Sequence, residues 1–363
     1  MDPGHPTANA ASPAPGPGRL AMAAAGAGVV LPIPDPTESA RLLQADTSLA
    51  SDLPAGHRSG FVALIGRPNV GKSTLVNRLV GEKVAITSPV AQTTRHRLRA
   101  ILTTASAQLV LLDTPGIHKP HHLLGERLVQ TARSCIGDVD VVLLLMDGSQ
   151  AAGRGDSYIV ELLRHCRAPV LVALNKHDLV AADRAEALSA SYRELLEARG
   201  AWAAPTPQPP LDWPLHPVSA LTGAGSTALV DALSAALPPG PRLYPTDAVS
   251  DQPERLLLAE LIREQVLCHT REEVPHSVAV SVDRVVEDGP RTAVLATVVV
   301  ERPSQKAILI GKGGRMLRTI GQGARLQMQK LLAGPVYLEL FVKVVPGWRG
   351  SAARLAEFGY RGE

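Results

Sequence analysis

Two kinds of apolar pattern alternate between residues 61 and 237. Short unbroken apolar runs, typical of strands buried in a parallel sheet, are followed by segments with apolar residues at every third or fourth position, typical of helices. We predict strands at residues 61–65, 98–103, 108–112, 139–146, 169–174 and 215–218, and helices at 71–80, 123–135, 157–166, 181–199 and 226–237. This alternation predicts a three-layer α/β domain that binds ligands at the carboxyl ends of its strands.

The pattern changes in the last third of the chain. Residues 255–270 have the spacing of an amphipathic helix, and residues 277–286 and 292–300 alternate as two strands around a turn at 287–290. Helices are predicted at 305–310 and 316–332, separated by GKGG, with a closing strand at 335–345. The chain therefore divides into an extension (1–57), an α/β domain (58–238), a linker (239–253), a smaller α+β domain (254–346) and a partly helical tail (347–363).

Two segments do not follow these patterns. Residues 1–57 are rich in proline, alanine and glycine, and because such a stretch buries little we predict that it is disordered. A processed targeting segment is the alternative for this extension. The proline-rich residues 203–214 are predicted to form a surface loop.

Composition narrows the class of protein. A chain of 363 residues with 45% hydrophobic positions can bury two cores, and an aromatic content of 3% means that aliphatic side chains must fill them. The three cysteines lie far apart, which argues against a disulfide framework or a metal cluster and fits a reducing cytosol. No stretch has the ~18 consecutive apolar residues that a membrane span needs. The net charge of +3 is too small to identify a polyanionic partner by itself.

The sequence GRPNVGKST spans residues 66–74, between the first predicted strand and the first predicted helix. In that context the pattern G-x-x-x-x-G-K-[ST] is a phosphate-binding loop, because glycines let backbone N–H groups face the phosphates and the helix N-terminus adds positive potential. Lys72 would reach the β- and γ-phosphates, and the Ser73 hydroxyl would bind Mg²⁺. The nucleotide contacts assigned here are Gly66, Asn69, Val70, Gly71, Lys72, Ser73 and Thr74.

Two further stretches would sense the terminal phosphate. DTPG (Asp113, Thr114, Pro115, Gly116) ends an apolar strand, where Asp113 can hold Mg²⁺ through water and the Gly116 N–H can contact the γ-phosphate. Residues 84–97 include the sequence QTTR at 92–95, and one of its two threonines can bind Mg²⁺ only while the γ-phosphate is present. The sequence does not choose between Thr93 and Thr94. We assign catalysis to Lys72, Asp113 and Gly116, and the metal site to Ser73, Thr93, Thr94 and Asp113.

Two stretches after later strands would recognise the base. Asp178 of NKHD can accept both adjacent donors of guanine, a pair that adenine lacks, so it would select GTP over ATP. Asn175 would tie the loops together, and the stem of Lys176 would cover the base. In the tripeptide Ser219, Ala220 and Leu221, the backbone N–H of Ala220 would meet the guanine O6 atom.

The smaller domain carries a candidate RNA site. No acidic residue occurs from 302 to 338, whereas basic residues stand at Arg302, Lys306, Lys312, Arg315, Arg318, Arg325 and Lys330. Small residues in GKGG let a sugar-phosphate backbone approach, and Ile308, Leu309 and Ile310 would floor a groove for unstacked bases. The RNA contacts assigned here are Lys306, Gly311, Lys312, Gly313, Gly314, Arg315 and Arg318.

GRPNVGKST, AQTTRHR, DTPGIHKP, NKHD and SAL, followed by a GKGG domain, resemble the Era family of ribosome-assembly GTPases over roughly residues 59–360. The tail sequence VKVVPGWRG…LAEFGY at 342–360 also resembles that family. The resemblance implies a P-loop GTPase domain followed by a type II KH domain, with GTP or GDP and Mg²⁺ as ligands. It also implies small-subunit ribosomal RNA near its 3′ end and 30S pre-ribosomal particles as partners, and a role in ribosome biogenesis.

The catalytic water raises a separate question. Ras-like GTPases position that water with a glutamine just after the second motif, but here Ile117 follows Gly116 and has no hydrogen-bonding side chain. Relatives with an asparagine in the phosphate loop, as Asn69 stands here, often use K⁺, so K⁺ dependence is a hypothesis for this chain.

Several expectations remain open alternatives. We expect a cytoplasmic monomer, with peripheral membrane association through the basic face as a further hypothesis. The other candidates are an RNA-binding chaperone that uses GTP as a structural ligand and a different RNA-modification GTPase. Trp348 is predicted to pack the tail, Arg95, His96 and Arg97 to contact RNA or a regulator or else be solvated, and His118, His121 and His122 to be solvated.

Overall fold

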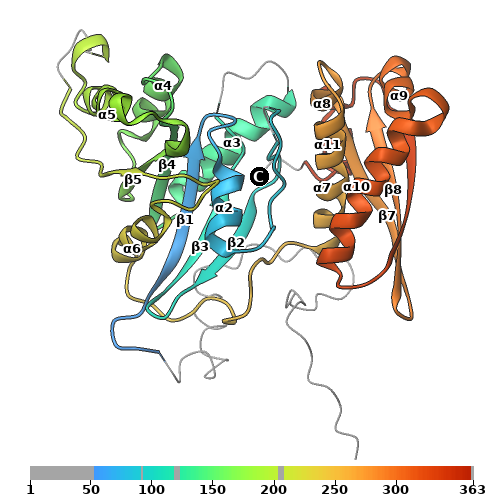
Figure 1. Cartoon of the computed structure of the whole chain (residues 1–363), viewed down its shortest axis with the longest axis horizontal. Coiled ribbons are helices and arrows are strands. Elements are labelled where there is room, and N and C mark those ends of the chain that lie inside the picture. The colour runs from blue at the N-terminus through green and yellow to red at the C-terminus, as the bar shows by residue number, and fades with distance from the viewer. Residues whose placement is uncertain (1–52, 91–92, 118–122, 203–207, 361–363) are drawn as a thin grey trace, which may run out of the picture.

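The computed structural model describes residues 53–90, 93–117, 123–202 and 208–360. Two domains lie side by side, a larger one built from the first two thirds of the chain and a smaller one from the last third (Figure 1). The histidines at 118, 121 and 122 and the extension at 1–52 lie outside the described residues.

The larger domain is built on a six-stranded sheet in the order β2-β3-β1-β4-β5-β6. All neighbouring strands are parallel except β2 and β3, which pair antiparallel. The strand bounds are β1 (Arg58–Gly66), β2 (Leu98–Thr103), β3 (Ala107–Asp113), β4 (Val141–Asp147), β5 (Val170–Asn175) and β6 (Leu215–Pro217). Each predicted strand is present, with ends that differ by at most a few residues.

Helices cover both faces of this sheet. The bounds are α2 (Lys72–Val80), α3 (Leu123–Gly137), α4 (Arg154–Leu163), α5 (Ala182–Leu196) and α6 (Ser226–Ala236). Successive residues of a strand point to opposite faces, so Val62 and Leu64 pack in one apolar cluster with α2 and α6, while Ala63 and Ile65 pack in another with α3, α4 and α5. The three-layer prediction is confirmed.

The smaller domain has a three-stranded sheet in the order β7-β8-β9, in which β7 and β8 are antiparallel and β8 and β9 are parallel. Its elements are α7 (Glu254–His269), α8 (Val274–Ser277), β7 (Ala279–Asp288), β8 (Arg291–Val300), α9 (Pro303–Ile310), α10 (Arg315–Leu331) and β9 (Val336–Val344). Residues from α7, α9 and α10 share one apolar core with β8 and β9. The sequence predicted this order but not the short helix α8.

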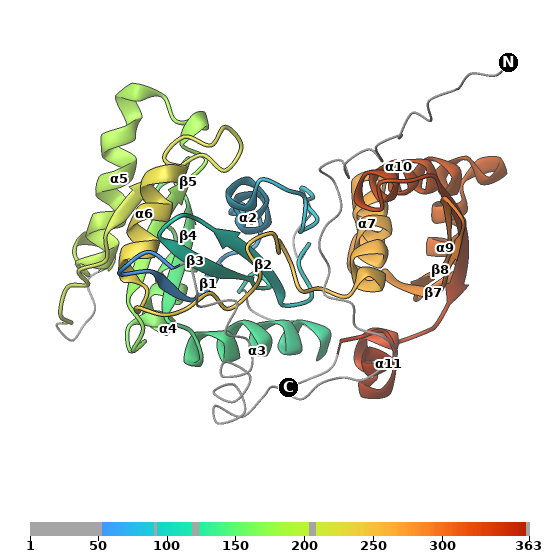
Figure 2. The ribbon, with the colours of Figure 1, turned by 90° about the horizontal axis from the view of Figure 1, so that it is seen from below.

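The tail joins the two domains. Trp348 is fully buried, and its indole N–H donates to the carbonyl of Ser277 at 3.0 Å. It shares an apolar cluster with Leu124 and Leu128 of α3 and with Tyr360, and the last helix, α11 (Ala352–Glu357), lies beyond one end of α3 (Figure 2). The predicted packing of Trp348 is therefore confirmed, and the tail packs against both domains.

The described part of the proline-rich segment, residues 208–214, is a loop at the surface, as predicted, but two of its side chains pack inward. Leu211 and Trp213 pack against the apolar cluster under α3, α4 and α5. The backbone N–H of Leu211 donates to the carbonyl of Leu196, and that of Val172 donates to the carbonyl of Pro214, each at 3.0 Å. Residues 208–214 thus cover the end of α5 and the edge of the sheet, because Leu211 and Trp213 pack against the core there.

None of the described helices is both long enough and apolar enough to cross a membrane.

Candidate functional site

The predicted nucleotide residues meet at one edge of the large sheet, where β1, β3, β5 and β6 end. Gly66 ends β1, and the loop after it turns with positive φ at Asn69 and Gly71, 62° and 100°, before α2 begins at Lys72. The Lys72 amine is buried and donates to the carbonyls of Gly66 (3.2 Å) and Arg67 (3.0 Å). The loop therefore wraps around its own lysine, as a phosphate-binding loop does.

Three glycines allow the loops to approach one another. A Cβ atom on Gly71 would lie 2.2 Å from Nδ2 of Asn175, and one on Gly66 would lie 2.4 Å from the carbonyl oxygen of Leu145. A Cβ atom on Gly116 would lie 2.6 Å from the backbone nitrogen of Pro68. Any side chain at these positions would push the phosphate loop away from its neighbours.

Oxygen atoms gather where the sequence predicts magnesium. The Ser73 hydroxyl donates to Oδ2 of Asp113 at 2.6 Å and lies 2.8 Å from the Thr94 hydroxyl, which donates to the same carboxylate oxygen at 3.2 Å. The other carboxylate oxygen, Oδ1 of Asp113, is buried without a hydrogen-bond partner among the described residues. Hydroxyl and carboxylate oxygens are the ligands that Mg²⁺ prefers, so this group of side chains fits the ion.

The two threonines of the segment differ in position. The Thr93 hydroxyl donates to the carbonyl of Val90 at 2.7 Å and lies 2.8 Å from the hydroxyl of Ser88, within its own loop. Thr94 instead directs its hydroxyl at Ser73 and Asp113. The geometry therefore separates two residues that the sequence left equivalent.

Burial perturbs the charged groups of this site. Desolvation lowers the pKa of Lys72 to about 8, although the charge of Asp113 acts in the opposite direction. Desolvation likewise raises the pKa of Asp113 above its ordinary value, against the opposing effects of Lys72, Ser73 and Thr94. Buried charged groups with perturbed pKa values are typical of sites that bind charged ligands.

Asn175 joins the phosphate side of the site to the base side. Its Nδ2 donates to the carbonyl of Val70 at 2.7 Å, and its Oδ1 accepts from the backbone N–H of Ala220 at 2.9 Å. The N–H of Ala220, which the sequence assigned to the guanine O6, thus donates to Asn175 in this structure, and its contact with guanine stays a prediction. The hydroxyl of Ser219 donates to Oδ1 of Asp178 at 2.5 Å and so orients the carboxylate assigned to guanine.

Asp147 belongs to this site but was not predicted. It ends β4, and its Oδ2 pairs with the Lys176 amine at 2.7 Å. Burial would raise the pKa of Asp147, but Lys176 and Ser149 outweigh it and hold the pKa below its usual value. The pair holds the Lys176 stem in place. A signal was present in the sequence, since Asp147, like Asp113, follows an unbroken apolar run.

The GKGG sequence forms a tight turn between α9 and α10. Gly311, Gly313 and Gly314 have φ values of 68°, 61° and 75°. A Cβ atom on Gly313 or Gly314 would meet nothing within 4 Å, so the surface there is open. Lys312 lies within this turn, and Arg315 and Arg318 follow it at the start of α10. Of the three apolar residues expected to floor a groove, Leu309 is fully buried in the domain core while Ile308 is 49% exposed.

Comparison with known proteins agrees with both domains. The family described as "50S ribosome-binding GTPase" matches residues 61–176, and the family described as "KH domain" matches residues 273–349. GTPase Era of Synechocystis sp. is 57% identical over 310 residues, which cover 85% of this chain and 95% of the relative. The chain belongs to the Era family of GTPases.

Other Era proteins support the same assignment. GTPase Era of Nostoc sp. is 56% identical over 310 residues, 85% of this chain and 92% of that protein. A crystal structure of Era in complex with MgGDPNP and nucleotides 1506–1542 of 16S ribosomal RNA has a TM-score of 0.78 and 36% identity, covering 84% of this chain and 99% of that one. An Aquifex aeolicus Era variant bound to GDP and AlF4⁻ gives a TM-score of 0.77 with the same identity and coverage.

In this Era-family chain, Arg95 and His96 face the KH domain. Arg95 is only 3% exposed and donates to the carbonyls of Val278 (2.6 Å) and Pro275 (3.1 Å). The His96 ring stacks on Tyr360 with a centroid separation of 4.9 Å, and burial lowers the pKa of His96. Of the alternatives left open for this segment, neither RNA contact nor solvation describes Arg95, because its guanidinium is used within the chain.

Helix α7 supplies three charged residues that sequence reasoning missed. Glu260 and Arg263 form an ion pair, and Glu264 pairs with Lys83 at 2.6 Å. Arg263 and Glu264 are buried. No motif marks them, and the only available signal was charged residues among the apolar positions of an amphipathic helix.

Proposed function

We propose that this GTPase couples the binding and hydrolysis of GTP to RNA binding by its KH domain during small-subunit assembly. One observation carries the proposal: the same segment, residues 84–97, contributes Thr94 to the proposed magnesium site and Arg95 to the contact with the KH domain. The RNA class comes from the solved relative, which holds a 16S ribosomal RNA fragment. Exchange of GTP for GDP would therefore change the position of this segment at the contact between the two domains.

We assign the following roles within the GTPase site. Ser73, Thr94 and Asp113 would hold Mg²⁺, which supplies charge neutralisation for the β- and γ-phosphates when bound. Lys72 would neutralise the same phosphates, Gly116 would contact the γ-phosphate, and Asp178 would select guanine. Thr93 is no longer assigned to the metal, since its hydroxyl bonds within its own loop.

For the group that orients the attacking water, K⁺ is our hypothesis. Ile117 is buried and apolar, so it cannot orient water. Asn69 donates through Nδ2 to the carbonyl of Pro89 at 2.9 Å, which leaves its Oδ1 as an oxygen ligand for a monovalent cation. Turnover should fall when K⁺ is replaced by Na⁺, and equal turnover in the two salts would remove the hypothesis.

For the RNA site we propose Lys306, Lys312, Arg315 and Arg318 as phosphate contacts, with the backbone approaching at Gly311, Gly313 and Gly314. The basic side chains around the turn and its open surface support this assignment. We also propose that the functional modules span residues 58–238 and 254–346, joined by 239–253 and followed by the tail 347–363. The start of β1 at Arg58 and of α7 at Glu254 supports these limits.

The test is crosslinking of the full chain to total cellular RNA, with and without a non-hydrolysable GTP analogue. Crosslinks should concentrate near the 3′ end of small-subunit ribosomal RNA and change with the nucleotide. Crosslinks spread over all RNA and indifferent to nucleotide would refute the coupling. A single-turnover assay of γ-phosphate release distinguishes this function from a chaperone that binds GTP without hydrolysing it.

We further propose that the protein acts as a cytoplasmic monomer that associates peripherally with the inner face of the plasma membrane. The basic residues of α9 and α10 support an attraction to anionic surfaces. Flotation with anionic vesicles tests the membrane contact, and light scattering of the free protein tests the monomer.

A further inference from the structure

We propose that the KH domain positions the magnesium-binding threonine of the GTPase domain, and that Arg263 of α7 is the positioning residue. The inference rests on the proposed function, because it concerns the Mg²⁺ site in which Thr94 takes part. A side chain of the RNA-binding domain would thus help to build the GTP-bound state of the nucleotide site.

Both chain neighbours of Thr94 are held by the KH domain. On one side, Nη2 of Arg263 donates a hydrogen bond to the backbone carbonyl of Thr93. On the other side, the Arg95 guanidinium donates to the carbonyls of Val278 at 2.6 Å and Pro275 at 3.1 Å. Because the residues flanking Thr94 are fixed from outside the GTPase domain, the position of the Thr94 hydroxyl follows the position of the KH domain.

A second attachment lies earlier in the same segment. Glu264, the next residue of α7, accepts the backbone N–H of Thr87 at 2.8 Å and the amine of Lys83 at 2.6 Å. The side chain of Ile86 enters the apolar core of the KH domain. The segment is thus held against the KH domain both at residues 83–87 and at residues 93–95.

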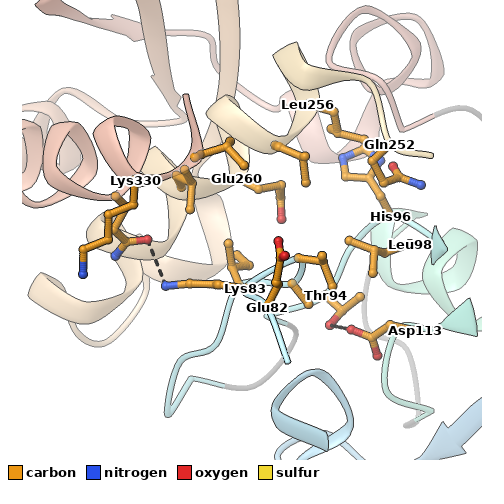
Figure 3. A pocket seen from close by; sticks show the side chains of 17 residues that line it. Glu82, Lys83, Thr94, His96, Leu98, Asp113, Gln252, Leu256, Glu260 and Lys330 are labelled. Atoms are coloured by element: carbon orange, nitrogen blue, oxygen red, sulfur yellow. Dashed lines mark hydrogen bonds between the residues drawn. The ribbon is translucent and has the colours of Figure 1, made fainter. Parts of the chain in front are cut away.

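Between these attachments the two domains are not in close contact. A cavity of about 590 Å³ lies between them, lined by Val84, Leu98 and Thr94 on one side and by Leu256, Leu257 and Leu261 of α7 on the other (Figure 3). Asp113 also lines it, so the cavity borders the proposed magnesium site. Packing along its whole length therefore cannot hold this segment in position, and the contacts at its two ends, the hydrogen bonds together with the packing of Ile86, must do so.

Arg263 is well built to position a neighbour. Its side chain is 0% exposed, and its guanidinium makes two hydrogen bonds to Glu260, from Nε at 2.8 Å and from Nη2 at 2.5 Å. The planar fork cannot turn without breaking this pair, so the donor that reaches Thr93 has a fixed direction. Helix α7 is itself packed in the domain core through Leu258 and Ile262.

Displacing Thr94 should affect the binding of GTP and not that of GDP. A threonine of this kind is needed at Mg²⁺ only while the γ-phosphate is present, so its loss should weaken GTP binding and leave GDP binding nearly unchanged. A partner that shifts α7 should therefore change the ratio of the affinities for GTP and GDP. By linkage, exchanging GDP for GTP must change the affinity for that partner by the same factor.

The test uses the full chain carrying Glu260→Gln together with Arg263→Met, so that no charge of the pair is left buried alone. Affinities for GDP and for a non-hydrolysable GTP analogue are measured with Mg²⁺ by titration. We expect the analogue to bind about tenfold more weakly, about 1.4 kcal/mol, with GDP affinity within about twofold of wild type and kcat for GTP reduced. The matched control is Arg271→Met, which removes an exposed arginine just beyond α7 and should change neither affinity.

The ratio of the two affinities decides the result. A merely structural role would weaken GTP and GDP equally, and that outcome, or an unchanged ratio, overturns the proposal. If the double variant does not fold, the same ratio is measured for Arg263→Lys. Lysine keeps a positive charge beside Glu260 but lacks the planar guanidinium that reaches Glu260 and Thr93 at once. Absence of GTP hydrolysis by the wild-type chain would instead count against the proposed function.

Discussion

Replacing Asn175 with alanine should weaken both GTP and GDP, because one buried amide holds two loops of the site together. The side chain is 2% exposed, donates to the carbonyl of Val70 at 2.7 Å and accepts from the N–H of Ala220 at 2.9 Å. Alanine leaves both backbone groups unpaired in a buried setting. At about 1–1.5 kcal/mol for each hydrogen bond, the loss is about 2–3 kcal/mol, equivalent to roughly 30- to 150-fold in affinity.

The assay is titration of a fluorescent GDP and of a non-hydrolysable GTP analogue, with a thermal melt to establish that the variant is folded. The matched comparison is Asn77→Ala, which also removes an amide that bridges two segments, here between α2 and the backbone of Val84 and Ala85. Because those residues lie in the segment that we propose to sense the γ-phosphate, this change should affect the GTP analogue more than GDP. A folded Asn175→Ala protein that binds GDP within about threefold of wild type would refute the reasoning.

The remaining predictions concern the lysine, the tail, the base and the RNA loop. The pKa of Lys72 near 8 means that binding of GDP to the empty site requires proton uptake at higher pH, so affinity should fall by up to about tenfold per pH unit above 8, and Lys72→Met should abolish this dependence. Trp348→Ala should cost about 3–5 kcal/mol in the unfolding free energy, measured by denaturant titration, because it empties a fully buried site, whereas Trp348→Phe should cost clearly less. Asp178→Asn should shift base preference away from guanine in competition binding, and unchanged preference would contradict its role. Gly313→Asp should weaken RNA retention on a filter while GTP hydrolysis continues at the wild-type rate, since a carboxylate there would face the RNA phosphates.

Most of the site could be predicted from local sequence, for a physical reason. Strand, glycine turn and helix are short-range structures, so a motif such as residues 66–74 carries its own backbone geometry with it. The parallel order of strands then brings their carboxyl ends to one edge of the sheet, which is why Asp113, Asn175 and Ser219 lie along the same edge although they are distant in the sequence. The GKGG turn between two helices follows from the same local rules.

Only the tertiary structure decided the contacts between distant segments. It placed Thr94 and not Thr93 beside Ser73 and Asp113, turned the N–H of Ala220 toward Asn175, and paired Asp147 with Lys176. It also buried Arg95 against the KH domain and set Arg263 beside Thr93, 170 positions away in the chain. Periodicity and motifs describe what each segment prefers locally. These contacts depend instead on how distant segments pack, within the GTPase domain or between the two domains, and no local pattern records that packing.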